Sequence, residues 1–509
     1  MQTIKTFSNL GLESFLVTVE ADSSKALPGI EIIGLPDASI KEAKERIRST
    51  FRNIGLQLPV KRFILNLAPS DVKKIGTSFD LPMAVALLSL IQETPKVFDE
   101  MLFFGELGLD GTIKRVNGIL PAVISAIKQG YTKFCIPEEN SYELEYIPNI
   151  EVYPLKNFQQ IVDFVDQGKI LPQIIDHPPI EQLASKPHAM VDFADIKGHL
   201  VAKRAMSIAA AGQHNVLMIG APGCGKTMLS KALQGILPPL SFKEMLEVSQ
   251  IYSVVGKLDK ENPLITHRPF RQVHHTASKV AIVGGGQYLR PGEVSLAHKG
   301  ILFFDELTEF PREVLEVLRQ PIEDKTIAIS RASGTVQYPA NVMFVGAMNP
   351  CKCGYHKDPD ITCKCSLGEI QRYQSKISGP LLDRIDMILE IPRQNIDKIL
   401  NKVKIESSEQ LREKVIQARK IQQERFKNTE IFSNAHMTAK HIDEYITLTS
   451  PVKDLLTRAA DKLNLSARVI HRSIKLARTI ADMDGKEHIQ SSHIAEALQY
   501  RSKTMFVQG

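Results

Sequence analysis

The stretch that decides the fold lies at residues 216–227 and reads Val216-Leu-Met-Ile-Gly220-Ala-Pro-Gly-Cys-Gly-Lys226-Thr227. Its four apolar residues predict a buried strand, its glycines predict a tight turn, and Lys-Thr begins a helix. In such a turn, backbone N–H groups surround a polyphosphate and the helix N-terminus adds partial positive charge. The pattern predicts a site for a nucleoside triphosphate, formed by Gly220, Ala221, Pro222, Gly223, Cys224, Gly225, Lys226 and Thr227.

A second apolar run, Ile301-Leu-Phe-Phe304, ends in two carboxylates, Asp305 and Glu306. Such a run predicts a buried parallel strand, and open α/β sheets carry their chemistry at the carboxyl ends of these strands. We expect Lys226 to reach the β- and γ-phosphates, and Thr227 and Asp305 to hold Mg²⁺. Glu306 would polarise the water that attacks the γ-phosphate, a residue that a passive nucleotide binder does not need. The expected reaction is hydrolysis of ATP.

Two further polar residues belong to this predicted site. Asn349 follows the apolar run Val342-Met-Phe-Val-Gly346, and from the neighbouring strand end it would orient the lytic water; the alternative is an ordinary Asn in a turn. Arg384 lies in the segment Gly379-Pro-Leu-Leu-Asp-Arg384 and could stabilise transition-state charge at the γ-phosphate of a neighbouring subunit. The alternative for Arg384 is a pair with a nearby carboxylate, such as Asp383 or Asp386.

The length of 509 residues favours about three domains. Residues 1–170 mix short apolar runs with helical periods, and residues 171–190 read as a linker. Residues 191–393 alternate strands and helices around the glycine-rich turn, which predicts a parallel sheet. Residues 394–509 predict a helical lid with amphipathic stretches at 406–428, 439–448, 451–463, 466–483 and 491–500. Arg468, in the fourth stretch, could close over the nucleotide.

The composition is that of an ordinary globular protein, with 43% hydrophobic and 24% charged residues. It shows no run of about 18 apolar residues and no signal-peptide core, so we expect a soluble, cytoplasmic protein without a membrane partner. A net charge of +6 favours an anionic partner only weakly.

Four cysteines lie close together, as Cys351-Lys-Cys353 and Cys363-Lys-Cys365. Four thiolates within fifteen residues suit a structural Zn²⁺ site, although Cys-x-Cys is tighter than the usual Cys-x₂-Cys. His356 could replace one ligand, and reduced thiols or redox disulfides are the alternatives.

Two segments inside the central region exceed ordinary connections. Residues 327–338 predict a β-hairpin with Arg331 at its tip and Lys325 at its base. Residues 269–299 are rich in Gly, His and Arg, and predict a functional loop. If the hairpin meets nucleic acid, these two cations would contact phosphates without reading the base sequence.

Together, the glycine-rich turn, Asp305-Glu306, Asn349, Arg384 and Arg468 resemble an AAA+ ATPase of the magnesium-chelatase-like branch. The strings Arg271-Gln-Val-His-His275, Val283-Gly-Gly-Gly286, Arg290-Pro-Gly-Glu293 and Asn349-Pro-Cys-Lys-Cys353 closely resemble the ComM (YifB) family over essentially the whole chain. This resemblance implies a hexameric ATPase that acts on branched or single-stranded DNA, with the hairpin pointing into the pore of the ring. It implies a DNA branch-migration helicase as the function. The alternative is a protein-remodelling or metal-insertion ATPase of the magnesium chelatase type.

The N-terminal region is similar to the Lon protease domain at Gly76-Thr-Ser78 and at residues 105–120. Ser78 falls near the place of the nucleophile, but Leu120 occupies the place of the lysine that would activate it. We therefore expect a Lon-like α+β domain without peptidase activity, which disfavours a third reading, an ATP-dependent protease.

Overall fold

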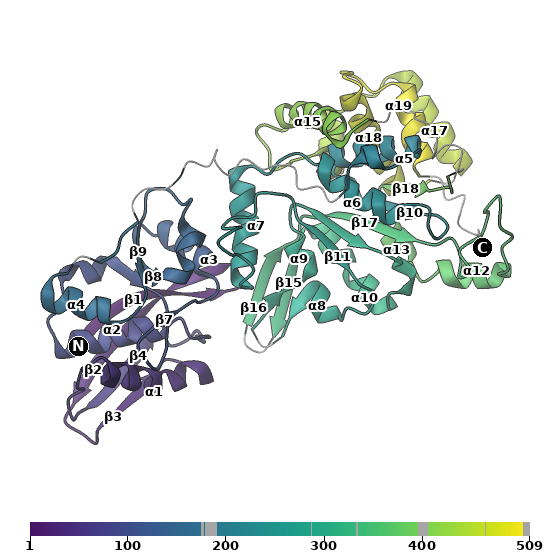
Figure 1. Ribbon diagram of the computed structural model, residues 1–509. Coiled ribbons are helices and arrows are strands. Elements are labelled where there is room, and N and C mark those ends of the chain that lie inside the picture. The colour runs from purple at the N-terminus through teal and green to yellow at the C-terminus, as the bar shows by residue number, and fades with distance from the viewer. Residues whose placement is uncertain are drawn as a thin grey trace.

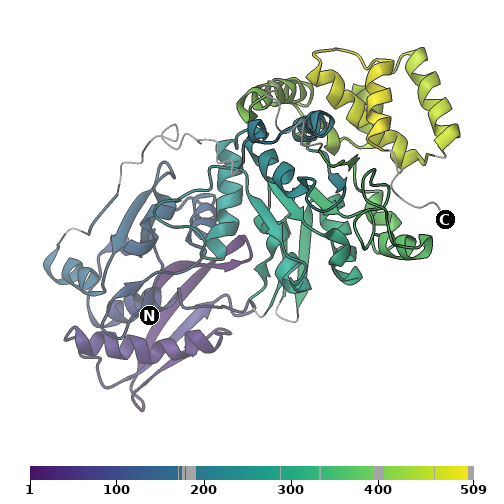
Figure 2. The same ribbon diagram turned by 45° about the vertical axis from the view of Figure 1, so that its right-hand side comes forward.

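The computed structural model describes residues 1–169, 171–174, 178, 191–286, 288–331, 334–394, 406–463 and 465–501. Figures 1 and 2 show an N-terminal α+β domain, a central domain built on a parallel sheet, and a C-terminal helical domain that packs on the central one. The predicted α/β class is confirmed. Most of the predicted linker, residues 171–190, lies outside the described residues.

The N-terminal domain is built on a mixed sheet of seven strands in the order β3-β4-β2-β1-β5-β8-β9. The strands are β1 (Gln2–Leu10), β2 (Glu13–Ser24), β3 (Gly29–Ile33), β4 (Arg62–Ala68), β5 (Met101–Phe103), β8 (Lys133–Pro137) and β9 (Glu151–Leu155). A separate ladder joins β6 (Glu106–Leu107) and β7 (Ile113–Lys114). β1 and β2 form a long antiparallel hairpin, which turns at Gly11.

Helices cover both faces of this sheet and form two separate cores. One core contains side chains of α1 (Ala38–Asn53), α2 (Asp80–Ile91) and α4 (Gln159–Gln167). The other contains α3 (Ile119–Ile127), including the fully buried Leu120. Ser78 lies just before α2, which packs in the first core, whereas Leu120 belongs to α3 in the second core.

The central domain holds five parallel strands in the order β11-β14-β17-β10-β18. They are β10 (Val216–Ile219), β11 (Phe270–Val273), β14 (Ile301–Phe304), β17 (Met343–Met348) and β18 (Met387–Glu390). β10, β14 and β17 are buried along their whole length, as their apolar runs predict. The helices are α5 (Leu200–Gly212), α6 (Lys226–Ile236), α7 (Phe242–Val254), α8 (Lys279–Val283), α9 (Glu293–Leu296), α10 (Arg312–Val317), α11 (Arg319–Asp324), α12 (Leu367–Gln374) and α13 (Gly379–Leu382).

The segment at residues 269–299 differs from the loop that its composition predicts. Its first residues form β11, an edge strand of the central sheet, and the rest forms α8, α9 and a short ladder between β12 (Gly284–Gly285) and β13 (Arg290–Pro291). The strand was missed because Phe270-Arg-Gln-Val273 has only two apolar residues, which suffices at an edge where one side of the strand has no neighbour in the sheet. The predicted hairpin is confirmed as β15 (Thr326–Arg331) and β16 (Gly334–Pro339).

The N-terminal and central domains share one hydrophobic core. Side chains of α7 pack with α3, and the Ser253 hydroxyl donates to the buried Glu143 carboxylate at 2.5 Å. Burial raises the pKa of Glu143, and the hydrogen bonds from Ser253 and Asn140 oppose that rise. The backbone N–H of Gly118 also donates to the Ser253 carbonyl at 3.0 Å. These buried contacts hold the two domains together at α7 (Figure 1).

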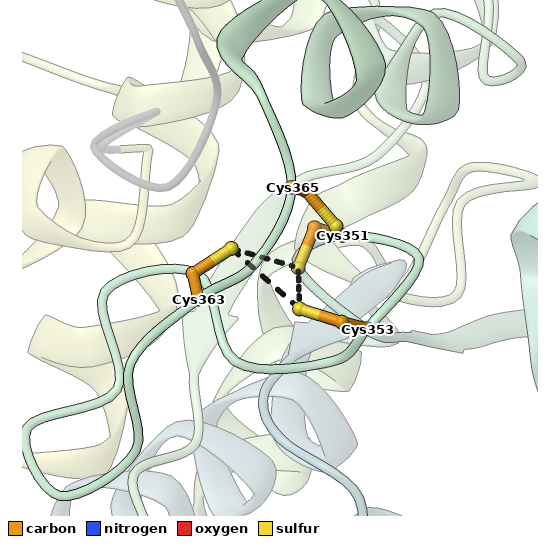
Figure 3. A group of neighbouring side chains, drawn as sticks. All are labelled: Cys351, Cys353, Cys363 and Cys365. Atoms are coloured by element: carbon orange, nitrogen blue, oxygen red, sulfur yellow. Dashed lines mark hydrogen bonds between the residues drawn. The ribbon is translucent and has the colours of Figure 1, made fainter.

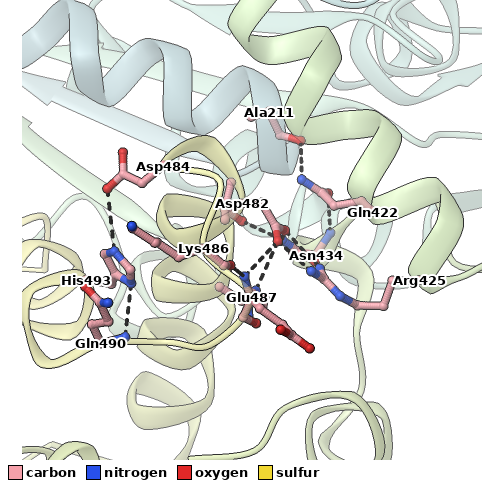
Figure 4. Close-up of polar contacts among 12 residues, drawn as sticks. Ala211, Gln422, Arg425, Asn434, Asp482, Asp484, Lys486, Glu487, Gln490 and His493 are labelled. Atoms are coloured by element: carbon pink, nitrogen blue, oxygen red, sulfur yellow. Dashed lines mark hydrogen bonds and ion pairs between the residues drawn. The ribbon is translucent and has the colours of Figure 1, made fainter.

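The C-terminal domain contains α15 (Ser408–Arg425), α16 (Ala439–Tyr445), α17 (Ser450–Leu463), α18 (Ala467–Met483) and α19 (Ser491–Gln499), near the five predicted stretches. Asp482 is the centre of its polar network (Figure 4): its carboxylate accepts from Arg425 at 2.9 Å and from Asn434 at 2.7 Å. Gln422 then links α15 to the central domain by donating to the Ala211 carbonyl at 3.1 Å.

Candidate active site

The glycine-rich turn, residues 220–227, joins β10 to α6 at the carboxyl edge of the central sheet. Gly223 and Gly225 have φ values of +75° and +88°, left-handed conformations that favour glycine. The Lys226 ammonium donates to the carbonyl oxygens of Gly220 and Ala221, at 2.7 and 3.0 Å. The ammonium is thus held within the turn, where phosphate oxygens could replace these acceptors.

Two neighbouring strands deliver polar groups to this turn. The Thr227 hydroxyl donates to Asp305 Oδ2 at 2.8 Å, and Lys226 Nζ donates to Asn349 Oδ1 at 3.2 Å. Asp305 follows β14 and Asn349 follows β17, and β17 lies between β14 and β10 in the sheet. The strand order therefore brings together Lys226, Thr227, Asp305 and Asn349, four residues of the predicted site.

Glu306 lies at the end of β14 and its side chain is 59% exposed. Its backbone has a φ of +50°, a left-handed value that is uncommon outside glycine, and its N–H donates to Asp305 Oδ1 at 3.0 Å. This conformation directs the two successive carboxylates to different places: Asp305 bonds to Thr227, whereas Glu306 faces solvent. This arrangement suits Asp305 to ligate a metal ion and Glu306 to contact a water molecule.

His275 joins the candidate site, although the sequence indicated it only as part of the string Arg271–His275. Its Nδ1 lies 3.9 Å from a carboxylate oxygen of Glu306, and its ring packs on His274 with 4.3 Å between centroids. His275 comes two residues after β11, which pairs with β14. A polar residue that follows a strand of this sheet is a candidate for the site. His275 was not recognised in this way because β11 itself was not predicted.

Arg384 lies at the opposite, amino edge of the sheet. It comes three residues before β18, which runs parallel to β10 in a register that pairs Val216 with Met387. Its guanidinium donates to Glu323 and, at 2.8 Å, to the Pro380 carbonyl. The carboxylate partner is therefore Glu323 rather than the sequence neighbours Asp383 or Asp386.

Arg468 lies on α18, a helix that reaches this edge through Arg472. It is exposed near the start of α18, one turn before Arg472. Arg472 donates to the Arg384 carbonyl at 3.1 Å and forms an ion pair with Asp386. Burial alone would raise the pKa of Asp386, but Arg472 and His214 outweigh it and hold that pKa well below its usual range. The start of α18 is thereby fixed beside Arg384.

Comparison with known proteins gives separate matches for the N-terminal, central and C-terminal domains. The sequence model of the family described as "Magnesium chelatase, subunit ChlI" matches residues 192–399, that of "Subunit ChlI of Mg-chelatase" matches residues 19–140, and that of the ChlI C-terminal family matches residues 405–501. Competence protein ComM of Haemophilus influenzae is 38% identical over 507 residues, which cover 98% of this chain and 97% of that protein. The chain belongs to the ComM/YifB family of magnesium chelatase-like AAA+ proteins.

Other relatives agree with this membership. Protein YifB of Escherichia coli is 38% identical over 505 residues, covering 99% of this chain and 97% of that protein. Lon protease 2 of Bacillus subtilis is 28% identical over 185 residues, covering 34% of this chain and 32% of that protein. The resemblance inferred from the motifs is thus confirmed, and membership in an AAA+ family indicates an ATPase.

In this ComM/YifB-family chain the four clustered cysteines come together in space (Figure 3). Their Sγ atoms all lie within 4.8 Å of one another. Cys351 Sγ is 3.3 Å from Cys353 Sγ and 3.7 Å from Cys363 Sγ, and Cys353 and Cys363 are 3.6 Å apart. Cys365 completes the group. The cysteine loop, which we define as residues 350–366, therefore offers four converging sulfur ligands.

One face of the β15–β16 hairpin packs against the rest of the protein. Ile327, Ile329, Val336 and Tyr338 are buried on one face, and the Tyr338 hydroxyl donates to the Leu289 carbonyl at 2.9 Å. Arg331 is exposed at the end of β15. Lys325 is half-buried at the base, where burial lowers its pKa to about 8 and nearby Arg472 and Lys475 act in the same direction.

Within the described part of this family member, none of the helices has the length and apolar character needed to span a bilayer.

Proposed function

We propose that this chain is the subunit of a homohexameric, cytoplasmic, ATP-driven DNA motor that promotes branch migration of recombination intermediates, as in natural transformation. Membership in the ComM/YifB family supports the proposal, since a competence protein is 38% identical over nearly the whole chain. The observation that carries it is the division of the catalytic groups between two edges of one sheet: the glycine-rich turn at the carboxyl edge and Arg384 at the amino edge. A single chain cannot bring these groups to one phosphate, whereas a ring of chains can.

The carboxyl edge has the groups that ATP hydrolysis needs. The backbone of the glycine-rich turn and Lys226 would bind the phosphates, and Thr227 and Asp305, 2.8 Å apart, offer the hydroxyl and carboxylate oxygens that suit Mg²⁺. Bound Mg²⁺ would neutralise charge on the β- and γ-phosphates. Glu306 would accept a proton from the attacking water, and Asn349 would orient that water.

The amino edge would supply two arginines to the nucleotide site of the neighbouring subunit. Arg384 would leave Glu323 and stabilise the charge of the γ-phosphate bound by the next chain. Arg468 would approach the same nucleotide, because α18 begins beside Arg384. One chain would thus contribute the phosphate site and the next chain both arginines.

The hairpin supports DNA as the substrate. Arg331 carries a positive charge at its exposed end, and a phosphate contact there would give affinity without base specificity. We propose Arg331 as the main contact and Lys325 as a secondary one, because Lys325 is half-buried and its charge is weakened by its lowered pKa.

The test is ATP hydrolysis with and without four-way junction DNA, and branch migration of the same junction. We expect Arg331→Ala to lose most of the stimulation by DNA and to weaken the salt dependence of DNA binding. Arg312→Ala, which removes an exposed arginine at the start of α10, is the charge-matched control. A wild-type protein that four-way DNA does not stimulate would refute the DNA motor.

The second candidate is a protein-remodelling or metal-insertion ATPase. The matches to magnesium chelatase subunit ChlI over residues 192–399 and 405–501 favour it. This candidate predicts that DNA has no effect on hydrolysis. A third candidate, an ATP-dependent protease, is disfavoured because the fully buried Leu120 leaves no lysine at that position.

The cysteine loop is proposed to hold one structural Zn²⁺ through Cys351, Cys353, Cys363 and Cys365. A tetrahedral zinc with Zn–S bonds of about 2.3 Å separates its sulfurs by about 3.8 Å. The three sulfur distances of 3.3, 3.6 and 3.7 Å fit that geometry. Elemental analysis of protein purified without chelator should find one zinc per chain; a zinc-free preparation with full activity would contradict this assignment.

A further inference from the structure

The cysteine loop touches the glycine-rich turn directly. Gly354 has a φ of +87°, and a Cβ built on it would lie 2.6 Å from Pro222 Cδ and 2.8 Å from Pro222 Cγ. Its N–H donates to the Cys351 carbonyl at 3.0 Å, so Gly354 belongs to the turn that carries Cys351 and Cys353. The backbone that presents two sulfur ligands thus packs on the ring of Pro222, within the phosphate site.

Other contacts attach the same loop to the site. Pro350 follows Asn349, which bonds Lys226, and the Pro350 carbonyl accepts from the buried Gln374 at 2.8 Å. Farther along, Asp358 pairs with Arg393 at 3.6 Å. A small cavity of about 100 Å³ lies between the cysteine loop and the root of the glycine-rich turn.

Within the loop itself, turn hydrogen bonds and side-chain contacts take the place of regular secondary structure. Residues 350–366, all of which the structure describes, contain neither helix nor strand. Four thiolates bound to one metal would join the two ends of the loop, Cys351-Cys353 and Cys363-Cys365, and thereby hold Gly354 against Pro222. Four unbound thiols would make only weak S–H···S contacts, and would leave the position of Gly354 to its turn and to the contacts of Pro350 and Asp358.

We propose that metal occupancy of the cysteine loop sets the nucleotide affinity of the glycine-rich turn. The metal-bound loop supports Pro222 from outside and keeps the backbone N–H groups of residues 220–227 in the geometry that binds phosphate. The inference rests on the proposed zinc and nucleotide sites but not on DNA. Because coupling between two binding sites is reciprocal, the nucleotide must raise the zinc affinity by the factor by which zinc raises the nucleotide affinity.

The first experiment measures this factor on the wild-type protein. Zinc affinity is determined by competition with a chromophoric chelator, with and without saturating Mg-ADP. We expect ADP to tighten zinc binding about tenfold, within the usual range of coupling between sites. Equal zinc affinities in the two conditions would overturn the coupling. Absence of zinc binding, or of ADP binding, would instead refute the corresponding site, and so the failures are distinguishable.

The second experiment tests the contact itself. Gly354→Ala places a methyl group against Pro222, whereas Gly130→Ala introduces the same backbone strain, at a φ of +89°, with nothing within 4 Å of the new methyl group. We expect Gly354→Ala to bind a fluorescent ADP analogue about tenfold more weakly than Gly130→Ala does, which is the size typical of such coupling. Equal affinities in the two variants would overturn the proposal.

Pro222→Ala provides an independent arm, because it leaves the cysteine loop unchanged and removes the ring that Gly354 touches. In this variant the zinc affinity should respond to Mg-ADP much less than in the wild type. A response equal to the wild-type response would show that the coupling between zinc and nucleotide does not depend on this contact, and would overturn the proposal.

Discussion

Glu306 combines a left-handed backbone, with a φ of +50°, and a carboxylate in solvent. Residues other than glycine adopt this conformation at an energetic cost, and such strain is common at functional sites. The Nδ1 atom of the neighbouring His275 lies 3.9 Å from the carboxylate, beyond hydrogen-bonding distance. Geometry thus distinguishes Glu306 from the exposed acidic residues around it.

We predict that Glu306→Gln still binds ATP but hydrolyses it about 10²- to 10⁴-fold more slowly, because the amide cannot accept the proton of the attacking water. Steady-state hydrolysis and binding of a fluorescent nucleotide measure the two effects separately. Glu309→Gln, which neutralises an exposed carboxylate three residues away, is the matched control. A Glu306→Gln protein with the wild-type turnover would remove Glu306 from the mechanism.

Lys325 gives a prediction about pH. Burial lowers its pKa from an ordinary 10.5 to about 8, while Asp386 opposes the change. Between these values the unfolded chain binds more protons at this site than the folded chain, so stability rises with pH across that window. Lys325→Met should therefore raise the melting temperature at pH 7 and reduce the rise in stability between pH 8 and 10. Lys41→Met, at an exposed position of α1, is the control; a lower melting temperature for Lys325→Met at pH 7 would contradict the argument.

At the scale of elements, the β15–β16 hairpin packs against the β1–β2 turn of the N-terminal domain. Gly11, between β1 and β2, has a φ of +73°, and a Cβ there would lie 2.1 Å from Val336 Cγ1 on β16. Leu10 and Leu12 pack against the core that contains Val336 and Tyr338. The N-terminal domain therefore contacts the proposed DNA element directly, which gives the domain a role without peptidase chemistry.

Gly11→Ala should displace β16 and reduce stimulation of hydrolysis by DNA, with a smaller effect on hydrolysis without DNA. Gly55→Ala is matched in backbone conformation, with a φ of +80° and nothing within 4 Å of the added Cβ. Both variants are assayed with and without junction DNA. Equal stimulation in the two variants would mean that the β1–β2 turn does not position the hairpin.

The elements that the sequence predicted are those with a local signal. β10 and β14 are runs of four buried apolar residues, and the glycine-rich turn carries its own spacing. β11 was missed because an edge strand needs few apolar residues. The partner of Arg384 is Glu323, 61 residues away, and Pro222 meets Gly354 across 132 residues. Such contacts depend on strand order and on domain packing, which no short segment of sequence encodes.

At the scale of the whole molecule, the proposed function requires that one chain present two halves of different catalytic sites. The glycine-rich turn and Arg384 lie at opposite ends of adjacent parallel strands, and Arg472 fixes the start of α18 beside Arg384. A closed ring would place the amino edge of each chain against the carboxyl edge of the next, since head-to-tail contacts generate rings when the rotation closes. Hydrolysis should then depend on pairs of chains rather than on single chains.

Mixing two inactive variants tests this dependence. Arg384→Ala should bind ATP almost normally and lose most hydrolysis, because the arginine that stabilises the neighbour's γ-phosphate is gone. Lys226→Ala should lose nucleotide binding or turnover, but it keeps Arg384. In a mixed ring, an Arg384→Ala chain that binds ATP can lie beside a Lys226→Ala chain that supplies the arginine, so hydrolysis should partly return. The double variant Lys226→Ala/Arg384→Ala, mixed with Arg384→Ala, is the control and should restore nothing. If mixed rings assemble and the first mixture is as inactive as the control, Arg384 does not act between subunits, and the division of the site between two edges has another purpose.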